Sequence, residues 1–321
     1  FTDKLIHKKD TLYGTLAPKR KNVSEDERLK LKTHFDILRA ITFKFKPKEK
    51  PCIPYGGLFG AFGYDMIDQF EDLPKEQEDP LETPDYELYY VDNLFVTDHK
   101  KSTTSFIVNA LITDANRNTI YQNAVKTLQQ YEKTLEKKPT KTKKAKHKSS
   151  VPQTDTPKEE FEKIVGTLKN NILRGDIFQV VPSRTLITES SAEPLSIYEE
   201  LKALNPSPYM FYINQEQGIL LGASPEMALR VQGEEEKTVE IRPIAGTKPR
   251  GLVNGEINLD LDSRYETELK IDRKELAEHT MLIDLARNDV AKVSETGTRF
   301  CNEPFVVEKY SHVQHLVSNV Q

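Results

Sequence analysis

Residues 274–289 read KELAEHTMLIDLARND, a stretch typical of a helix made for burial on one face. Glu275 and Glu278 stand three residues apart in it, with His279 beside them. Positions i and i+3 of a helix lie side by side, so the two carboxylates repel each other unless something positive sits between them. An isolated pair of this kind is also common on solvated helix faces. The stretch therefore predicts a helix and leaves open whether its acidic pair binds a cation.

Length and composition indicate a soluble globular protein of one large domain or two ordinary ones. The chain has 321 residues, of which 37% are hydrophobic and 30% charged. Its longest apolar runs, such as GILLGA at 218–223, are far shorter than the roughly 20 residues of a membrane-spanning helix. Two cysteines without CxxC spacing, and no visible secretory signal at the start, predict a reducing, cytoplasmic location and no membrane role.

A strongly basic run, KKPTKTKKAKHK at 137–148, stands out in a chain whose net charge is −4. A nucleic-acid-binding segment would need aromatic or Arg residues between the lysines for stacking and bidentate contacts, and the run has neither. Its composition is typical of a solvated linker that buries too little apolar surface to become ordered. We expect a flexible basic linker over residues 137–155 and no nucleic acid as partner.

The segments on either side of this linker alternate between strand and helix patterns. Two β-rich runs within 87–112, joined by the polar turn Asp98–Ser102, predict a hairpin, and 116–138 follows with a helical pattern. After the linker, Thr156 is expected to cap a helix that ends at Gly175. Short apolar runs and turns over 209–246 predict an antiparallel meander.

A strand is expected at 177–184, and Gln179 interrupts its apolar residues. Period-two alternation places Gln179 on the face opposite Phe178 and Val180, where it either faces water or lines a site. The SPE triplet at 224–226 and PIAGT at 243–247 are equally compatible with ordinary turn chemistry. None of these pieces identifies a function alone.

Taken in chain order, six sequence blocks are more specific: GDIFQVVPSR (175–184), NPSPYMF (205–211), GASPE (222–226), RPIAGTKPRG (242–251), ELAEHTMLIDLARNDV (275–290) and YSHVQHLVS (310–318). This set closely resembles the component I (large-subunit) family of anthranilate synthases, which are chorismate-utilising lyases. The resemblance begins near residue 50 and is weakest in the basic segment. It implies an α+β fold with antiparallel sheets packed face to face and flanked by helices.

The resemblance also implies a division of the chain. Residues 1–136 would be the N-terminal part of the subunit, and 156–321 the first part of its chorismate-binding catalytic domain. Family members carry a further N-terminal stretch, and a C-terminal segment with a second pair of helical carboxylates. We therefore expect a chain truncated at both ends, incomplete at the C-terminus and inactive by itself.

The activity implied is the conversion of chorismate and ammonia to anthranilate and pyruvate, the first committed step of tryptophan biosynthesis. Ammonia would come from glutamine through a partner amidotransferase subunit. Mg²⁺ prefers oxygen ligands and keeps several waters, so it could be the positive charge that holds Glu275 and Glu278 together. By resemblance, Glu278 is a direct metal ligand and Glu275 a neighbouring acidic partner that acts through water.

Further site residues follow from the same resemblance. Glu226 matches the general acid for the departing hydroxyl, a role that requires burial or a like-charged neighbour to keep it protonated. His315 matches the active-site histidine near that leaving group, and Gly246 and Thr247 match substrate-contacting positions. The expected tryptophan-binding residues are Asn205, Pro206, Pro208, Tyr209 and Met210, whose types a Pro-rich turn feeding a strand explains equally well.

Two positions discriminate within the wider family. Isochorismate synthases resemble this chain but place a water-activating Lys where Gln179 stands, and aminodeoxychorismate synthase has a nucleophilic Lys at the position of Ala245. An amide and a methyl group cannot perform those roles, so the nucleophile is expected to come from outside the chain, and ammonia is the natural candidate by this resemblance. The alternatives are those two activities and, as another class, a non-catalytic structural fragment.

Overall fold

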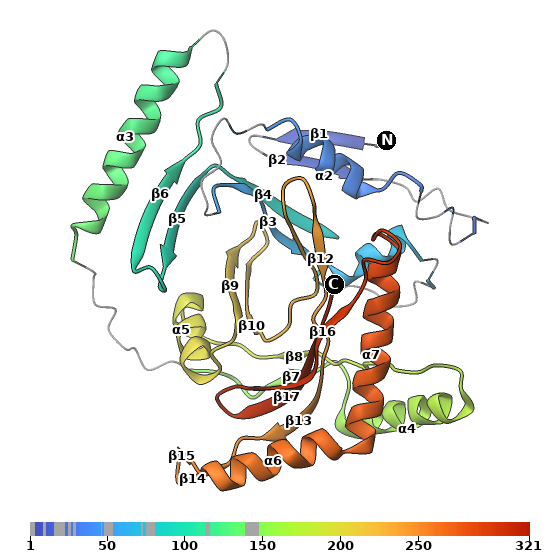
Figure 1. The fold of residues 1–321 in the computed structure, drawn as a ribbon. Coiled ribbons are helices and arrows are strands. Elements are labelled where there is room, and N and C mark those ends of the chain that lie inside the picture. The colour runs from blue at the N-terminus through green and yellow to red at the C-terminus, as the bar shows by residue number, and fades with distance from the viewer. Residues whose placement is uncertain are drawn as a thin grey trace. The chain divides into compact units, whose positions relative to one another are not determined.

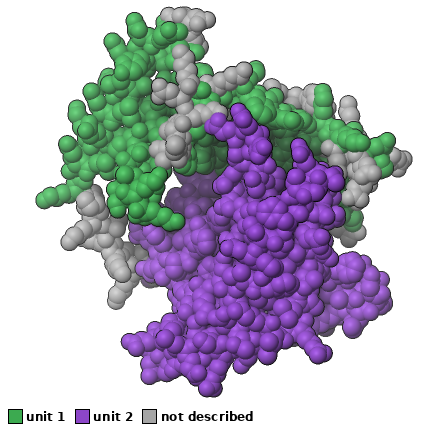
Figure 2. All heavy atoms as spheres, in the orientation of Figure 1, with its two compact units in different colours: residues 1–143 green, residues 144–321 purple. Residues whose placement is uncertain are grey.

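The computed structural model describes residues 4–8, 11–15, 23–24, 27, 30–45, 47, 54–71, 73–74, 81–112, 116–138 and 148–321. The chain forms two compact units, residues 1–143 and 144–321, which Figure 2 colours separately. The boundary falls inside the segment expected to be a linker, of which 139–147 lie outside the described residues. The end of that segment is paired, since Ser149 bridges Ser190 and strand β7 (Gln153–Thr154) pairs with β8 (Leu186–Ile187).

Three antiparallel strand pairs and two α-helices make up most of the described part of the first unit (Figure 1). The predicted hairpin is confirmed, because Asp98 of β5 pairs with Thr103 of β6, and so is the helix that follows it. Phe106 of β6 stacks on Tyr131 of that helix at 5.5 Å between ring centroids. The elements are β1 (Lys4–Lys8), β2 (Thr11–Thr15), α2 (His34–Thr42), β3 (Gly57–Phe62), the 3-10 helix η1 (Tyr64–Gln69), β4 (Tyr86–Val91), β5 (Asn93–Asp98), β6 (Thr103–Val108) and α3 (Arg117–Leu135).

The second unit is built around a three-stranded antiparallel sheet in the order β13-β17-β16 (Figure 1). The predicted antiparallel meander forms only in part, because β9–β10 and β11–β12 are antiparallel pairs in separate two-stranded sheets and the next strand, β13, pairs with β17. Besides β7 and β8, the elements are α4 (Lys158–Arg174), α5 (Pro194–Leu204), β9 (Tyr209–Asn214), β10 (Ile219–Ser224), β11 (Arg230–Gln232), β12 (Thr238–Glu240), β13 (Ile244–Pro249), β14 (Leu252–Val253), β15 (Glu256–Ile257), α6 (Leu259–Ile271), α7 (Arg273–Ala291), β16 (Cys301–Lys309) and β17 (Val313–Val320).

Helices α6 and α7 both pack against this sheet. Apolar residues of α7 at helical spacing, Ile283, Ala286 and Val290, form a buried cluster with Val320 of β17. His279 lies on the buried side of α7 as well, with no exposed surface, and its Nε2 contacts Ser318 Oγ at 2.7 Å. Burial lowers the pKa of its imidazole, which favours the neutral form of this core residue. The predicted helix over 274–289 is confirmed and is oriented by this core.

Two local predictions are wrong. Residues 177–184 form no strand, because strand pairing requires a neighbouring strand and the described residues provide none for this segment; Phe178 and Val181 are exposed. The N-cap residue of α4 is Pro157 rather than the expected Thr156. The backbone N–H of Thr156 instead donates a hydrogen bond to Thr154 Oγ1 at 3.3 Å. The expected end of this helix is confirmed by Gly175, whose φ of +81° is left-handed.

Described strand pairs are all antiparallel, and helices flank them, so the predicted α+β class with antiparallel sheets is confirmed. Within the described ranges, none of the helices combines the length and apolar character that a membrane crossing would need. The segment PIAGT, for which a turn was an open alternative, belongs largely to strand β13.

Candidate active site

The acidic pair lies in the first two turns of α7. Asp272 caps this helix, accepting hydrogen bonds from the backbone N–H groups of Lys274 and Glu275 at 3.0 and 3.3 Å. Glu275 therefore sits close to the helix N-terminus, where the helix dipole stabilises negative charge. Only 17% of its side chain is exposed, and its ion pair with Lys274, at 3.4 Å, involves a lysine that is 82% exposed. Screening by solvent makes that pair weak.

Strand β13 carries a bulge that brings its backbone against Glu275. The register of β13 with β17 shifts between Ala245 and Thr247, which leaves Gly246 as the extra residue with φ of +72°. A Cβ added to Gly246 would lie 3.2 Å from Glu275 Oε2 and 3.1 Å from Leu269 Cδ1. Position 246 therefore favours glycine both for its conformation and for the close approach of the carboxylate.

His315 lies on the neighbouring strand, β17, where it pairs directly with Thr247. Its Nδ1 is 3.0 Å from the carbonyl oxygen of Gly246 and 3.1 Å from Thr247 Oγ1. Because a carbonyl oxygen only accepts hydrogen bonds, the first contact requires the proton on Nδ1. Nε2 of the neutral imidazole then keeps a free lone pair, which can accept a proton from a bound molecule and return it.

Gln179 reaches the second carboxylate from a segment outside the sheet. Its Nε2 donates a hydrogen bond to Glu278 Oε1 at 3.4 Å, although the two residues are 99 positions apart in the chain. Gln179 is exposed and Glu278 is half-buried. The structure thus brings Gln179 to the acidic pair even though the strand expected to carry it does not form.

A small cavity of about 170 Å³ lies beside His315. It is also lined by Asn205, Pro206 and Pro225 and by the turn that begins at Tyr310. Glu226 follows Pro225, but its side chain is exposed, and its backbone N–H contacts Ser224 Oγ at 3.3 Å. The burial expected to keep Glu226 protonated is therefore absent from the described residues. Its role as an acid stays a prediction.

The expected tryptophan-binding residues lie in one stretch on either side of the start of β9. Asn205 ends α5, and Tyr209 and Met210 begin β9, paired with Ser224 and Ala223 of β10. Of this group, Asn205 and Pro206 line the same cavity as His315. The structure brings two of these residues to the histidine and does not show what they bind.

The acidic pair fits a hard divalent cation in its chemistry. Glu275 and Glu278 offer oxygen ligands only, which Mg²⁺ prefers, and Mg²⁺ usually keeps several waters rather than a full protein cage. In the part of the chain that the structure describes, no three His, Cys, Asp or Glu side chains gather into a ready-made metal site. Two carboxylates supply part of a coordination shell, and water and substrate oxygens would supply the rest.

Comparison with known proteins identifies the family of the chain. Residues 8–321 match a family described as chorismate binding enzyme. The chain belongs to this family. Among the similar chorismate-binding proteins, anthranilate synthase component 1 of Vibrio parahaemolyticus is 42% identical over 301 residues, which cover 93% of this chain and 54% of the relative. The same component from Buchnera aphidicola of Acyrthosiphon pisum is 41% identical, covering 93% of this chain and 56% of the relative.

A solved structure is similar along nearly the whole chain. The crystal structure of anthranilate synthase component I from Streptococcus pneumoniae matches with a TM-score of 0.77 and 27% identity, covering 98% of this chain and 65% of that one. The chain spans little more than half the length of the curated relatives it matches.

Sequence reasoning missed three residues that are linked to one another and, through the ring of Tyr310, to His315: Arg250, Asp262 and Tyr310. Arg250 and Tyr310 lie inside the sequence blocks quoted above, but nothing in their local pattern separated them from their neighbours. Asp262 looks like one more acidic residue near the start of α6. Its burial, with 3% of the side chain exposed, is visible only in the fold.

Proposed function

We propose that this chain forms the chorismate-binding part of an anthranilate synthase component I, which converts chorismate and ammonia to anthranilate, pyruvate and water. The relatives named above support this activity through their identity over most of the chain. The observation that carries the proposal is the contact of Gln179 with Glu278, at 3.4 Å. It puts an amide beside the acidic pair, at the position where isochorismate synthases have a water-activating lysine.

Ala245 supports the same conclusion at the second discriminating position. It is 7% exposed and pairs with Leu316 inside the sheet. Its methyl group offers no lone pair where aminodeoxychorismate synthase has a nucleophilic lysine. With neither lysine present, the chain supplies no amine or water-activating base of its own at these positions. External ammonia is then the nucleophile.

Glu278 and Glu275 would hold Mg²⁺, the first directly and the second through water. When bound, the cation offsets the charge of a substrate carboxylate and polarises it. Gly246 and Thr247 would contact the same substrate through a backbone N–H and a hydroxyl, both hydrogen-bond donors for a carboxylate. His315 would act at the departing C4 hydroxyl through Nε2, because Nδ1 is occupied by the Gly246 carbonyl. Glu226 would supply the proton that this hydroxyl needs.

Three features complete the proposal at the level of the whole protein. A partner amidotransferase subunit delivers ammonia from glutamine. Tryptophan inhibits by binding near Asn205, Pro206, Pro208, Tyr209 and Met210, of which the first two share a cavity with His315. The enzyme works in the cytoplasm, where its cysteines stay reduced.

Product identification tests the activity. The protein at its full natural length is given chorismate, Mg²⁺ and ammonium, and the products are separated and weighed by mass spectrometry. Anthranilate is expected with ammonium alone, and with glutamine only when the amidotransferase is added. Isochorismate or aminodeoxychorismate as the product overturns the proposal, and chorismate left unchanged supports a non-catalytic role. Calorimetry of chorismate binding to the 321-residue chain, with and without Mg²⁺, tests the site apart from turnover.

A matched pair of variants tests the metal ligand. Glu278→Gln removes the charge from the acidic pair, and we expect Mg²⁺-dependent turnover to fall by about 10- to 100-fold or more. Asp284→Asn, on the same helix, changes an exposed carboxylate that pairs with Arg287 at 3.1 Å and should leave turnover unchanged. Equal effects in the two variants would contradict the assignment of Glu278.

A further inference from the structure

The imidazole of His315 is bounded on two sides. Its Nδ1 edge meets Gly246 and Thr247, and the ring of Tyr310 stands edge-to-face against it with centroids 5.5 Å apart and planes at 63°. Tyr310 is the first residue after β16, in the turn that leads into β17 and His315. Edge-to-face pairs at this separation are attractive and constrain the orientation of both rings.

Tyr310 is itself held through its side chain. Its hydroxyl donates to Glu308 Oε2 at 2.8 Å, and the other oxygen of Glu308 accepts from Arg242 at 2.5 Å. Burial and the neighbouring Glu308 carboxylate raise the pKa of Tyr310 to about 12. The hydroxyl therefore stays protonated near neutral pH and remains a donor to Glu308.

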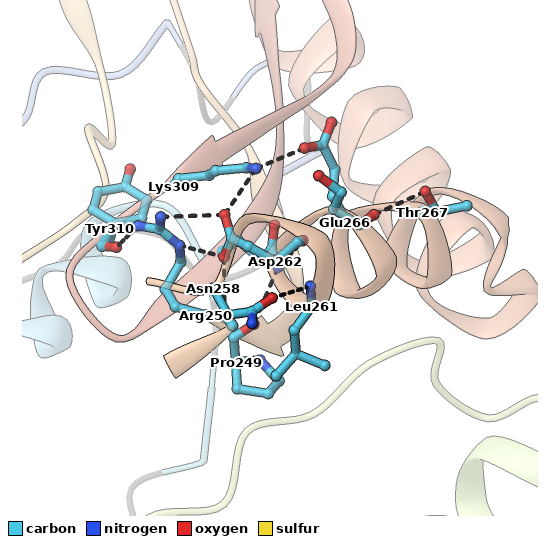
Figure 3. A network of polar contacts seen from close by, with 12 residues as sticks. Pro249, Arg250, Asn258, Leu261, Asp262, Glu266, Thr267, Lys309 and Tyr310 are labelled. Atoms are coloured by element: carbon cyan, nitrogen blue, oxygen red, sulfur yellow. Dashed lines mark hydrogen bonds and ion pairs between the residues drawn. The ribbon is translucent and has the colours of Figure 1, made fainter. Parts of the chain in front are cut away.

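Tyr310 is also held through its backbone (Figure 3). Its carbonyl oxygen accepts a hydrogen bond from Arg250 Nη1 at 2.5 Å. The same guanidinium donates two bonds to Asp262, from Nε at 2.7 Å and from Nη2 at 3.2 Å. Asp262 further accepts from Gly251 N–H at 2.9 Å and from Lys309 Nζ at 3.0 Å. Arg250 thus has little freedom, and Tyr310 is tied to the start of α6.

We propose that Tyr310 is a positioning residue that holds the His315 imidazole with Nδ1 against the Gly246 carbonyl and Nε2 free, and that the Arg250–Asp262 pair fixes Tyr310 for this task. The catalytic meaning of this arrangement rests on the proposed function, but the arrangement itself does not. A ring that swings away from the Gly246 carbonyl loses the acceptor that selects the Nδ1–H form, and its Nε2 no longer lies where the substrate needs it.

Nitrogen NMR of ¹⁵N-histidine-labelled protein reads the tautomer of His315 directly, without substrate. His315→Gln assigns the signal among the seven histidines. We expect the Nδ1–H tautomer in the unaltered chain and in Tyr310→Phe, which keeps the ring and loses only the hydroxyl. Tyr310→Leu, which loses the ring, should give a mixture of tautomers. Retention of the pure Nδ1–H form in Tyr310→Leu, or a mixture in both variants, overturns the proposal.

A matched control and a second variant guard against general damage. Tyr198→Leu removes another edge-to-face ring from this unit, which packs on Tyr212 with centroids 5.8 Å apart, and should leave the His315 signal unchanged. A shift in this control as well would overturn the proposal, because any lost ring would then suffice. Circular dichroism checks the fold of each variant, and Tyr310→Met takes the place of Tyr310→Leu should the latter fail to fold.

Kinetics at full natural length separate this inference from the proposed function. A displaced catalytic group lowers kcat more than it changes KM, so Tyr310→Leu should lose about 10- to 100-fold in kcat with KM nearly unchanged. Tyr310→Phe should stay within about threefold of the unaltered enzyme, because it keeps the ring that packs on His315. If the unaltered protein forms no anthranilate, the proposed function fails, and the tautomer measurement still decides the role of Tyr310.

Discussion

Two polar clusters lie on the elements that pack around the β13-β17-β16 sheet, and they differ in how fully their hydrogen-bonding capacity is used. The Asp262 cluster consists of Arg250, Asp262, Glu266 and Lys309; the Glu275 cluster consists of Gly246, Thr247, Glu275, Glu278 and His315. In the first, each oxygen of Asp262 accepts from two donors, and Lys309 also pairs with Glu266 at 2.8 Å. In the second, the carboxylates of Glu275 and Glu278 and Nε2 of His315 can still accept further hydrogen bonds.

The difference separates a cluster that stabilises the fold from one that is prepared for a ligand. Buried charges are stable only when they are paired, so a saturated cluster contributes to folding and has nothing left to offer a substrate. Half-buried carboxylates with unused lone pairs destabilise the folded chain but remain available to bind a ligand. Substitutions in the first cluster should therefore change stability, and substitutions in the second should change function.

The largest effect is expected from Asp262→Asn. The change leaves the guanidinium of Arg250, with 14% of its side chain exposed, without its charged partner, and breaking such a pair costs about 3–5 kcal/mol. Urea unfolding of the two proteins measures the difference. Asp260→Asn is the control, because Asp260 starts the same helix but its pair with Arg264 is exposed at 76% and 70%, and exposed pairs contribute about 0–1 kcal/mol. Similar losses of unfolding free energy in both variants would mean that the Asp262 cluster contributes no more to stability than an exposed ion pair.

The same cluster predicts a pH dependence. Hydrogen bonds from Arg250, followed by Gly251 and Lys309, hold the pKa of Asp262 well below its usual range. The unfolded chain, with an Asp pKa of about 3.9, takes up a proton on acidification before the folded chain does, so stability falls as pH drops below about 5. The stability gap between the unaltered protein and Asp262→Asn should be widest near pH 7 and narrow steadily toward pH 3. A gap that stays constant would contradict the lowered pKa.

A smaller effect is expected at Gly246, in the bulge of β13. Gly246→Ala places a Cβ at a left-handed φ, which costs about 1–2 kcal/mol, and pushes it against Glu275 and Leu269. Gly255→Ala is the matched control, because Gly255 has a φ of +86° but no atom within 4 Å of its added Cβ. Thermal unfolding should therefore show Gly246→Ala as the less stable of the two. Chorismate binding should be weakened only by Gly246→Ala, and equal behaviour in both assays would contradict the close approach of Glu275.

Sequence patterns anticipated the parts of this structure that depend on neighbours along the chain. The helix over 274–289, the hairpin around Asp98–Ser102 and the glycine stop at Gly175 follow from periodicity and turn chemistry, and all three form. The strand expected at 177–184 does not form, because alternation of apolar residues cannot show whether a partner strand exists. Element type is local information, whereas strand pairing is not.

The candidate site divides in the same way. The i, i+3 spacing predicted that Glu275 and Glu278 share one face of a helix, and both lie on α7, but nothing local indicated that the β13 bulge would bring Gly246 against Glu275. The saturation of Asp262 joins residues 250, 262 and 309, which are far apart in the sequence. Such contacts depend on the sheet order β13-β17-β16, which no window of sequence specifies.

The smallest change in stability is expected at Gln179, where a substitution should affect turnover and leave stability almost unchanged. Gln179 is exposed, and its contact with Glu278 is long at 3.4 Å, so Gln179→Ala should change the free energy of unfolding by less than about 0.5 kcal/mol. Under the proposed function the same change removes a donor that orients Glu278, so anthranilate formation at full natural length should fall by about 10-fold or more. Gln217→Ala, at an exposed position in the turn between β9 and β10, is the control and should change neither quantity. A Gln179→Ala variant that is less stable but turns over normally would show that the contact of Gln179 with the Glu275 cluster is structural. The proposed division, in which the Asp262 cluster determines stability and the Glu275 cluster determines function, would then be wrong.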